Sequence, residues 1–108
     1  MSGMESLSYE FTGTRGVQPF TPLVVGVVGS GNLEVLVEVG GEGGLSHFHI
    51  ETSARGFGDI WQAVVGDFHE RHRFKGLRFS INDMGATPAV VSLRLDQAAA
   101  GLKEEIAP

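Results

Sequence analysis

A serine between two glycines is the residue of this chain best placed for chemistry. Ser30 lies in the segment Gly29-Ser30-Gly31-Asn32, between the apolar run 23–28 and the alternating segment 33–39. Two short strands joined by a Gly/Asn loop predict a β-hairpin, with the Ser30 hydroxyl exposed at its tip. The same residue types also dominate ordinary turns, so composition alone favours a turn without chemistry.

The surroundings of Ser30 do not fit two well-known glycine motifs. A hydrolase nucleophile elbow needs G-x-S-x-G on a turn from strand to helix, and the order here is Gly-Ser-Gly-Asn. A phosphate-binding glycine loop opens a helix, whereas residues 33–39 alternate as a strand does. The chain has no cysteine, which excludes disulfides, thiolate zinc sites and a thioester on its own side chains.

Two histidines and a glutamate form a second group. His47, His49 and Glu51 alternate along one predicted strand. Alternate residues on a strand lie roughly 7 Å apart, which is too far for one ion without rotamer changes. We therefore predict a solvated sheet face and no metal.

A basic cluster and a loop complete the candidates. The cluster consists of Arg71, His72, Arg73 and Lys75. It could meet phosphate groups, but positive charge at a helix end also complements the helix dipole, and that explanation is favoured. In the loop 83–88, Asp83 could position a ligand or contact a partner. A plain connection is the simpler interpretation, with Gly85 at an unusual backbone angle and Pro88 opening a strand.

Length and composition indicate one small domain. The chain has 108 residues, 42% hydrophobic and 19% charged, which suits a single core. A net charge of −5 argues against a general nucleic-acid binder. Neither an apolar run of about 18 residues nor a secretory signal pattern is present, so we expect no membrane association and a cytoplasmic location.

Apolar periodicity predicts an α+β fold. Strands are expected at residues 7–11, 23–28, 33–39, 45–52, 77–82 and 89–96. One long amphipathic helix over residues 57–73 should bury Ile60, Val64 and Phe68, with Trp61 also in the core. One helix covers one face, so we predict a mainly antiparallel sheet of about five to six strands, plus a possible short C-terminal helix within 97–106.

Three segments together resemble a known family. Residues 27–36, Val-Val-Gly-Ser-Gly-Asn-Leu-Glu-Val-Leu, are similar to the modified-serine region of malonate decarboxylase acyl carrier (delta) subunits. Residues 4–11 and the segment 81–88, Ile-Asn-Asp-Met-Gly-Ala-Thr-Pro, resemble the same family. The resemblance spans residues 4–102, expected to form a single acyl carrier domain, with 103–108 as a C-terminal tail.

The resemblance implies a covalent cofactor. Ser30 would carry 2'-(5''-phosphoribosyl)-3'-dephospho-coenzyme A through a phosphodiester, and would act as an anchor, not a nucleophile. The thiol of this arm would hold acetyl and then malonyl as thioesters, which fits a chain without cysteine. Gly29 and Gly31 would leave room for the attaching enzyme, and Asn32 would help to hold the turn.

The resemblance also implies partners. They are the transferase (alpha) and decarboxylase (beta, gamma) subunits of malonate decarboxylase, a prosthetic-group transferase and a malonyl transferase, and this chain would be a non-catalytic carrier. Two alternatives stay open. One is the related carrier (gamma) subunit of citrate or citramalate lyase, which uses the same arm. The other is a small interaction domain without a cofactor, in which Ser30 is only a turn residue.

Overall fold

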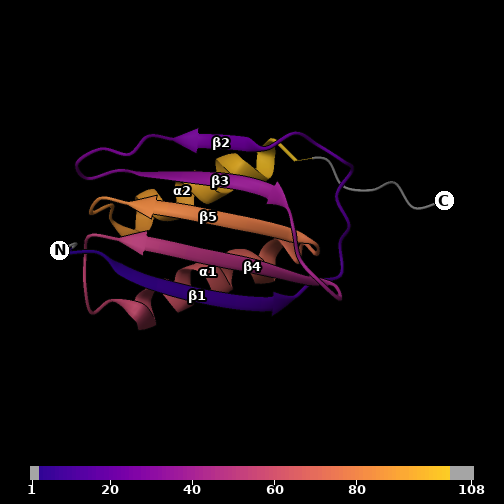
Figure 1. The fold of residues 1–108 in the computed structure, drawn as a ribbon, viewed down its shortest axis with the longest axis horizontal. Helices are drawn as coiled ribbons and strands as arrows, with labels where there is room; N and C mark the ends of the chain where they lie inside the picture. The colour runs from indigo at the N-terminus through magenta and orange to yellow at the C-terminus, as the bar shows by residue number, and fades with distance from the viewer. Residues whose placement is uncertain (1–2, 103–108) are drawn as a thin grey trace.

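The chain folds as one sheet covered on one face by helices (Figure 1). The structure is a computed structural model and describes residues 3–102, within which there are five strands and two helices. In chain order the elements are β1 (Glu5–Thr12), β2 (Leu23–Gly26), β3 (Leu33–Val39), β4 (Leu45–Thr52), α1 (Gly58–His72), β5 (Leu77–Asp83) and α2 (Pro88–Ala100). Neither of these two helices is long and apolar enough to cross a membrane.

The sheet is mainly antiparallel, as predicted. Its strand order is β1-β4-β5-β3-β2, and β4 with β5 is the parallel pair among these strands. A parallel pair needs a long crossover, and α1 provides it. The predicted hairpin is confirmed, because β2 and β3 pair antiparallel from Leu23 with Val37 to Gly26 with Glu34.

The inward faces of the strands build one apolar core against the helices. On β4, Phe48 and Ile50 are buried while His49 is exposed on the open face, which confirms the predicted alternation. The rings of Phe48 and Phe79 stack with centroids 4.5 Å apart. Phe68 of α1 meets both rings edge-on, at 6.1 and 5.6 Å. These contacts fix α1 over the centre of the sheet.

The predicted inward face of α1 is only partly right. Trp61 and Phe68 are buried as expected, together with Val65. Ile60, however, is 46% exposed and Val64 is half-buried. Positions 61, 65 and 68 follow the i, i+4, i+7 spacing of a stripe that lies one residue away from the predicted one. The sheet therefore packs against the stripe of Trp61, Val65 and Phe68. Ile60 and Val64 face α2 instead.

The strand predicted at 89–96 is wrong, because these residues belong to helix α2. Thr87 caps the helix, its hydroxyl accepting the Val90 N–H at 3.3 Å, and Pro88 occupies the first turn. Val91 and Leu95 are buried, while Leu93 is 51% exposed. The predicted C-terminal helix overlaps α2 at residues 97–100, and residues 103–106 lie outside the described part of the chain.

Candidate functional site

One edge of the sheet gathers the residues singled out in the sequence. The parallel strands β4 and β5 both end there, at Thr52 and Asp83. Because β3 runs antiparallel to β5 and pairs Leu33 with Asp83, the turn 27–32 projects from the same edge. Both helices also begin at this edge, which lies on the left of Figure 1. The carboxyl ends of parallel strands are a common place for binding sites.

Ser30 lies exposed at the tip of the turn between β2 and β3. The Asn32 N–H closes the turn by donating to the Gly29 carbonyl at 2.9 Å. Gly31 has φ +72°, a left-handed conformation that favours glycine, and a Cβ there would meet nothing within 4 Å. A Cβ on Gly29 would contact only Val27 Cγ2, at 4.0 Å. The Ser30 hydroxyl is therefore accessible from solvent with little obstruction from its neighbours.

The turn is anchored to the rest of the domain. The Gly31 N–H donates to the Met84 carbonyl at 2.8 Å, and the Met84 N–H donates to the Asn32 carbonyl at 2.9 Å. The Asn32 side-chain oxygen accepts the Leu33 N–H at 2.8 Å and Arg94 Nε at 3.2 Å. Asn32 thus holds the turn, as the sequence suggested, and connects it to α2. Ser30 therefore lies on a turn that the rest of the domain holds in place by hydrogen bonds.

Arg94 is a supporting residue that the sequence interpretation missed, because it placed this residue on a strand. On α2, Arg94 reaches both Asn32 and Gln97, with Nη1 3.0 Å from Gln97 Oε1. A Cβ on Gly26 would lie 2.2 Å from the Leu33 carbonyl oxygen and 3.2 Å from Arg94 Cδ. Only glycine fits this position, which also has φ +79°. Recognising Thr87-Pro88 as a helix start would have placed Arg94 correctly.

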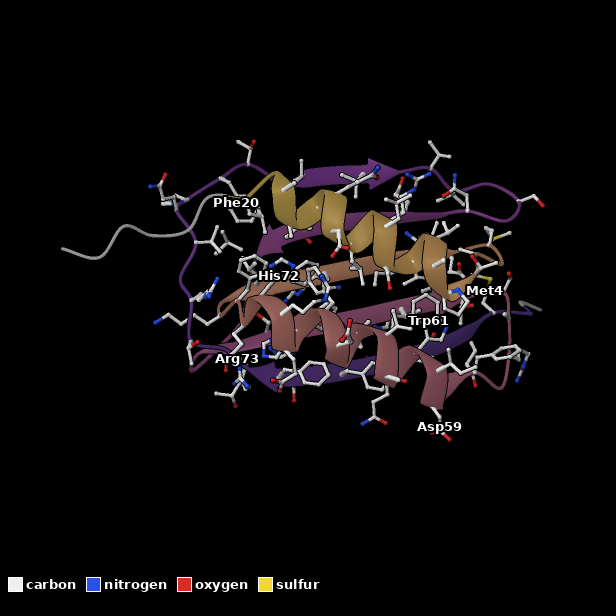
Figure 2. All side chains as sticks on the ribbon, turned by 180° about the vertical axis from the view of Figure 1, so that it is seen from behind. Met4, Phe20, Asp59, Trp61, His72 and Arg73 are labelled. Atoms are coloured by element: carbon white, nitrogen blue, oxygen red, sulfur yellow. The ribbon has the colours of Figure 1, made fainter. Side chains whose placement is uncertain are left out.

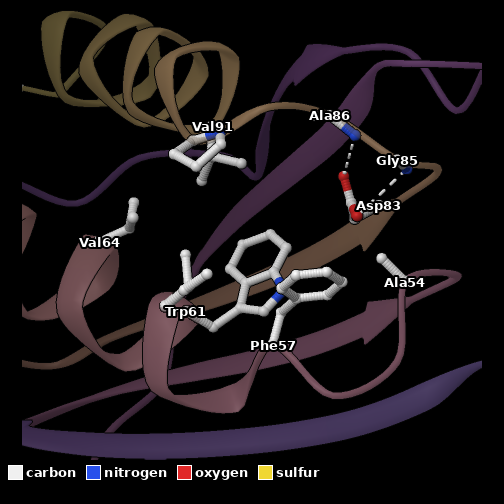
Figure 3. A pocket seen from close by; sticks show the side chains of 10 residues that line it. Ala54, Phe57, Trp61, Val64, Asp83, Gly85, Ala86 and Val91 are labelled. Carbon is white, nitrogen blue, oxygen red and sulfur yellow. Dashed lines mark hydrogen bonds between the residues drawn. The ribbon is translucent and has the colours of Figure 1, made fainter.

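Asp83 shapes the loop that holds the turn. Its side chain is 1% exposed. One carboxylate oxygen accepts the Ala86 N–H at 2.9 Å, and the other accepts the Gly85 N–H at 3.2 Å (Figure 3). This second oxygen also accepts the Thr52 hydroxyl at 2.8 Å. Gly85 has φ +88°, the unusual backbone angle expected for it. Asp83 therefore organises the connection between β4, β5 and α2.

Replacing Asp83 with alanine should lower the free energy of unfolding by about 2–4 kcal/mol, because three hydrogen-bond donors would lose a buried acceptor. Thr52→Val removes one of these donors and should cost less. Urea unfolding followed by circular dichroism measures both changes. Glu42→Ala, in the exposed loop between β3 and β4, is the control and should be neutral. Unchanged stability in Asp83→Ala would show that the loop does not depend on this carboxylate.

The histidines of β4 form pairs on the open face of the sheet. His47 Nδ1 lies 2.9 Å from a Glu10 oxygen, and His49 Nε2 lies 2.7 Å from a Glu51 oxygen. Ser6 donates to Glu51 at 2.6 Å, and these hydrogen bonds from Ser6 and His49 lower the pKa of Glu51. Within residues 3–102 no group of three or more His, Cys, Asp or Glu side chains could hold a metal ion.

The basic cluster lies at the opposite end of α1 from Trp61 and Asp59, as Figure 2 shows for His72 and Arg73. Arg71 lies 2.9 Å from Asp96 and 3.2 Å from Asp67, and the hydrogen bond to Asp96 raises the pKa of Arg71. Arg73 lies 2.6 Å from Glu70. These cations are engaged with acids of the two helices and lie far along the domain from the Ser30 edge. This geometry favours the helix-end interpretation.

Exposed apolar side chains flank the Ser30 turn. Val27 is 60% exposed and Val28 is 54% exposed, directly before Gly29. Met84, whose backbone anchors the turn, is also exposed. Where exposed apolar groups form a contiguous patch, they mark a site that another protein recognises.

An exposed serine on an anchored turn, beside exposed apolar groups in a small α+β domain, is the arrangement that a carrier domain requires. Comparisons with known proteins agree with this class. A family model described as the acyl carrier protein malonate decarboxylase delta subunit (MdcD) matches residues 21–102. The chain belongs to this family.

Relatives match along nearly the whole chain. The malonate decarboxylase acyl carrier protein of Burkholderia cepacia is 64% identical over 99 residues, which cover 92% of this chain and 91% of the relative. That of Xanthomonas campestris pv. campestris (strain B100) is 58% identical over 96 residues, covering 88% and 91%. A chain in the crystal structure of a Pseudomonas malonate decarboxylase hetero-tetramer in complex with malonate matches with a TM-score of 0.74 and 40% identity, covering 86% of this chain and 93% of that chain.

Proposed function

We propose that this chain is the non-catalytic acyl carrier subunit of a malonate decarboxylase and that Ser30 is the residue that bears its prosthetic group. The observation that carries the proposal is an accessible hydroxyl on an anchored glycine turn, in a chain of this family. An acyl carrier protein works through a covalently attached group. We propose that residues 4–102 form the carrier domain and that 103–108 are a tail.

The residues at the turn fit a phosphodiester-linked arm. An attaching enzyme must reach the Ser30 oxygen from outside, and the space around Gly31 is open. A fixed base then limits where the arm starts, because Gly31, Asn32 and Met84 hold the turn through backbone hydrogen bonds. The proposed group is 2'-(5''-phosphoribosyl)-3'-dephospho-coenzyme A. It would supply a thiol for carrying acetyl and malonyl as thioesters, which a chain without cysteine cannot supply itself.

The proposed partners are the other subunits of the decarboxylase. The matching solved structure is a malonate decarboxylase hetero-tetramer in complex with malonate. By analogy, this chain would meet a transferase (alpha) subunit and decarboxylase (beta, gamma) subunits, besides a prosthetic-group transferase and a malonyl transferase. Val27, Val28 and Met84 are the side chains that we expect these proteins to contact first. A cytoplasmic location is also proposed, since a reducing compartment keeps the arm thiol free.

The thiol provides the test. Protein produced without the attachment machinery should show the mass of the polypeptide alone and should not react with maleimide at a thiol, because the sequence contains no cysteine. Protein from a host with that machinery should gain the mass of the arm and take up one maleimide after deacylation. Acetylation should block this uptake, and hydroxylamine should restore it.

The same measurements separate the alternatives. If active native protein carries no added mass and no thiol, the proposal is wrong and a cofactor-free interaction domain becomes the better interpretation. A citrate or citramalate lyase carrier would pass the mass test, but the family match and the relatives favour malonate decarboxylase. Malonate-dependent acyl exchange with purified decarboxylase subunits distinguishes these two carriers.

A further inference from the structure

An apolar pocket opens next to the loop that anchors Ser30. It has a volume of about 260 Å³ and lies between the first turns of α1 and α2 (Figure 3). Its lining residues are mainly apolar: Ala54, Phe57, Ile60, Trp61, Val64, Ala86, Pro88 and Val91, with Asp83 and Gly85 at the loop. At roughly 30 Å³ per water molecule, the pocket has room for several water molecules. A short acyl group with its thioester therefore fits in the same space.

The pocket and the attachment turn share one loop. Met84 holds Gly31 and Asn32 through two backbone hydrogen bonds. Its neighbours in sequence, Asp83 and Gly85, line the pocket. A long flexible arm that starts at Ser30 therefore begins on a turn that is hydrogen-bonded to the loop lining the pocket. The high local concentration created by such a tether favours even a weak contact.

The polarity of the pocket lining bears on which acyl group would fit there. Asp83 is the one charged residue among those that line the pocket, and its carboxylate accepts hydrogen bonds from Thr52, Gly85 and Ala86. A malonyl carboxylate entering the pocket would lose water in a mainly apolar space and approach the Asp83 carboxylate. The exposed Arg55 is not part of the lining. A neutral acetyl group meets neither penalty.

We propose, on the basis of the proposed carrier function, that this pocket holds the acetylated end of the carrier's own arm and excludes the malonyl end. The acetyl thioester would then be sheltered from water while the carrier is between partners. Exchange of acetyl for malonyl would release the arm, because the added carboxylate is not accepted. The pocket would thus be occupied in the acetylated, resting carrier and empty in the malonylated carrier that is ready for decarboxylation.

Hydroxylamine cleavage of the thioester tests this proposal. Acetyl carrier should be cleaved at least about fivefold more slowly than acetyl-coenzyme A, since a mostly docked population is protected. Malonyl carrier should be cleaved at the rate of malonyl-coenzyme A. Ala86→Phe and, as a second variant, Ala54→Leu fill the pocket and should remove the protection. Leu93→Phe, on the exposed side of α2, is the matched control and should retain it.

Trp61 gives an independent readout, because it is the one tryptophan of the chain and lines the pocket. Its indole N–H resonance should shift on acetylation of the arm, not on malonylation, and should stay unshifted in Ala86→Phe. Equal cleavage rates and an unchanged indole resonance in protein whose mass confirms the arm would overturn the pocket proposal alone. Absence of the arm's mass would instead overturn the carrier function. A shift that requires a partner subunit would assign the pocket to that partner.

Discussion

Ser30→Ala should abolish arm attachment completely, and with it the ability of this subunit to support malonate decarboxylation. The proposed phosphodiester requires the serine oxygen, and alanine has no atom to replace it. The fold should not change, because Ser30 is exposed and substitutions at such positions usually stay within about 0.5 kcal/mol. The expected result is a stable protein that never gains the mass of the arm.

A second serine at the same edge provides the control. Ser53 is exposed, directly follows β4 and lies close to the loop of Asp83, since its N–H donates to the Asp83 carbonyl at 3.1 Å. Ser53→Ala should be modified at the parental rate when coexpressed with the attachment machinery. Intact mass and thermal unfolding should be measured on both variants. Modification that persists in Ser30→Ala would move the attachment site elsewhere.

Val65→Asp should prevent the domain from folding. Val65 is fully buried between α1 and the sheet, and an aspartate there would be a charge without a partner in the core. Such a change costs more than about 4 kcal/mol, a large part of the 5–15 kcal/mol by which domains are stable. Circular dichroism should show lost helix and strand signals, or a melting temperature far below that of the parent protein.

Neighbouring substitutions on α1 test its orientation. Val64→Asp should destabilise less than Val65→Asp, because Val64 is half-buried at the wall of the pocket and its carboxylate can reach water. Gln62→Asp, on the exposed side, should be close to neutral. The periodicity of the sequence alone had placed Val64 in the core. If Val64→Asp proves more damaging than Val65→Asp, that earlier orientation is right and the buried stripe described above is wrong.

The sequence by itself determined the features that depend on neighbours along the chain. A two-residue period predicts a strand with one buried face, so 33–39 and 45–52 were predicted with the bounds that the structure shows. Glycines and an asparagine between two apolar runs predict a hairpin, so the exposed position of Ser30 was also predictable. A resemblance in three segments then indicated the family that the comparisons show.

Where the local sequence pattern fits two structures equally well, only the tertiary structure decided between them. Val91 and Leu95 are four residues apart, a spacing that places them on one face of a helix and also on one face of a strand. Leu93 distinguishes the two, and its exposure follows from packing of α2 against the sheet and not from any local preference. Periodicity likewise leaves adjacent stripes of α1 nearly equivalent, because Phe68 belongs to both, and the packing of the domain buries Val65 in place of Ile60 and Val64.

The support of the Ser30 turn is also a product of the tertiary structure. Arg94 reaches Asn32 across 62 positions of the sequence, and Thr52 reaches Asp83 across 31. Hydrogen bonds of this kind depend on which strands become neighbours, and the parallel pairing of β4 with β5 brings Thr52 to Asp83. The apolar pocket arises in the same way, from two helix starts and two loops that are separate in the chain.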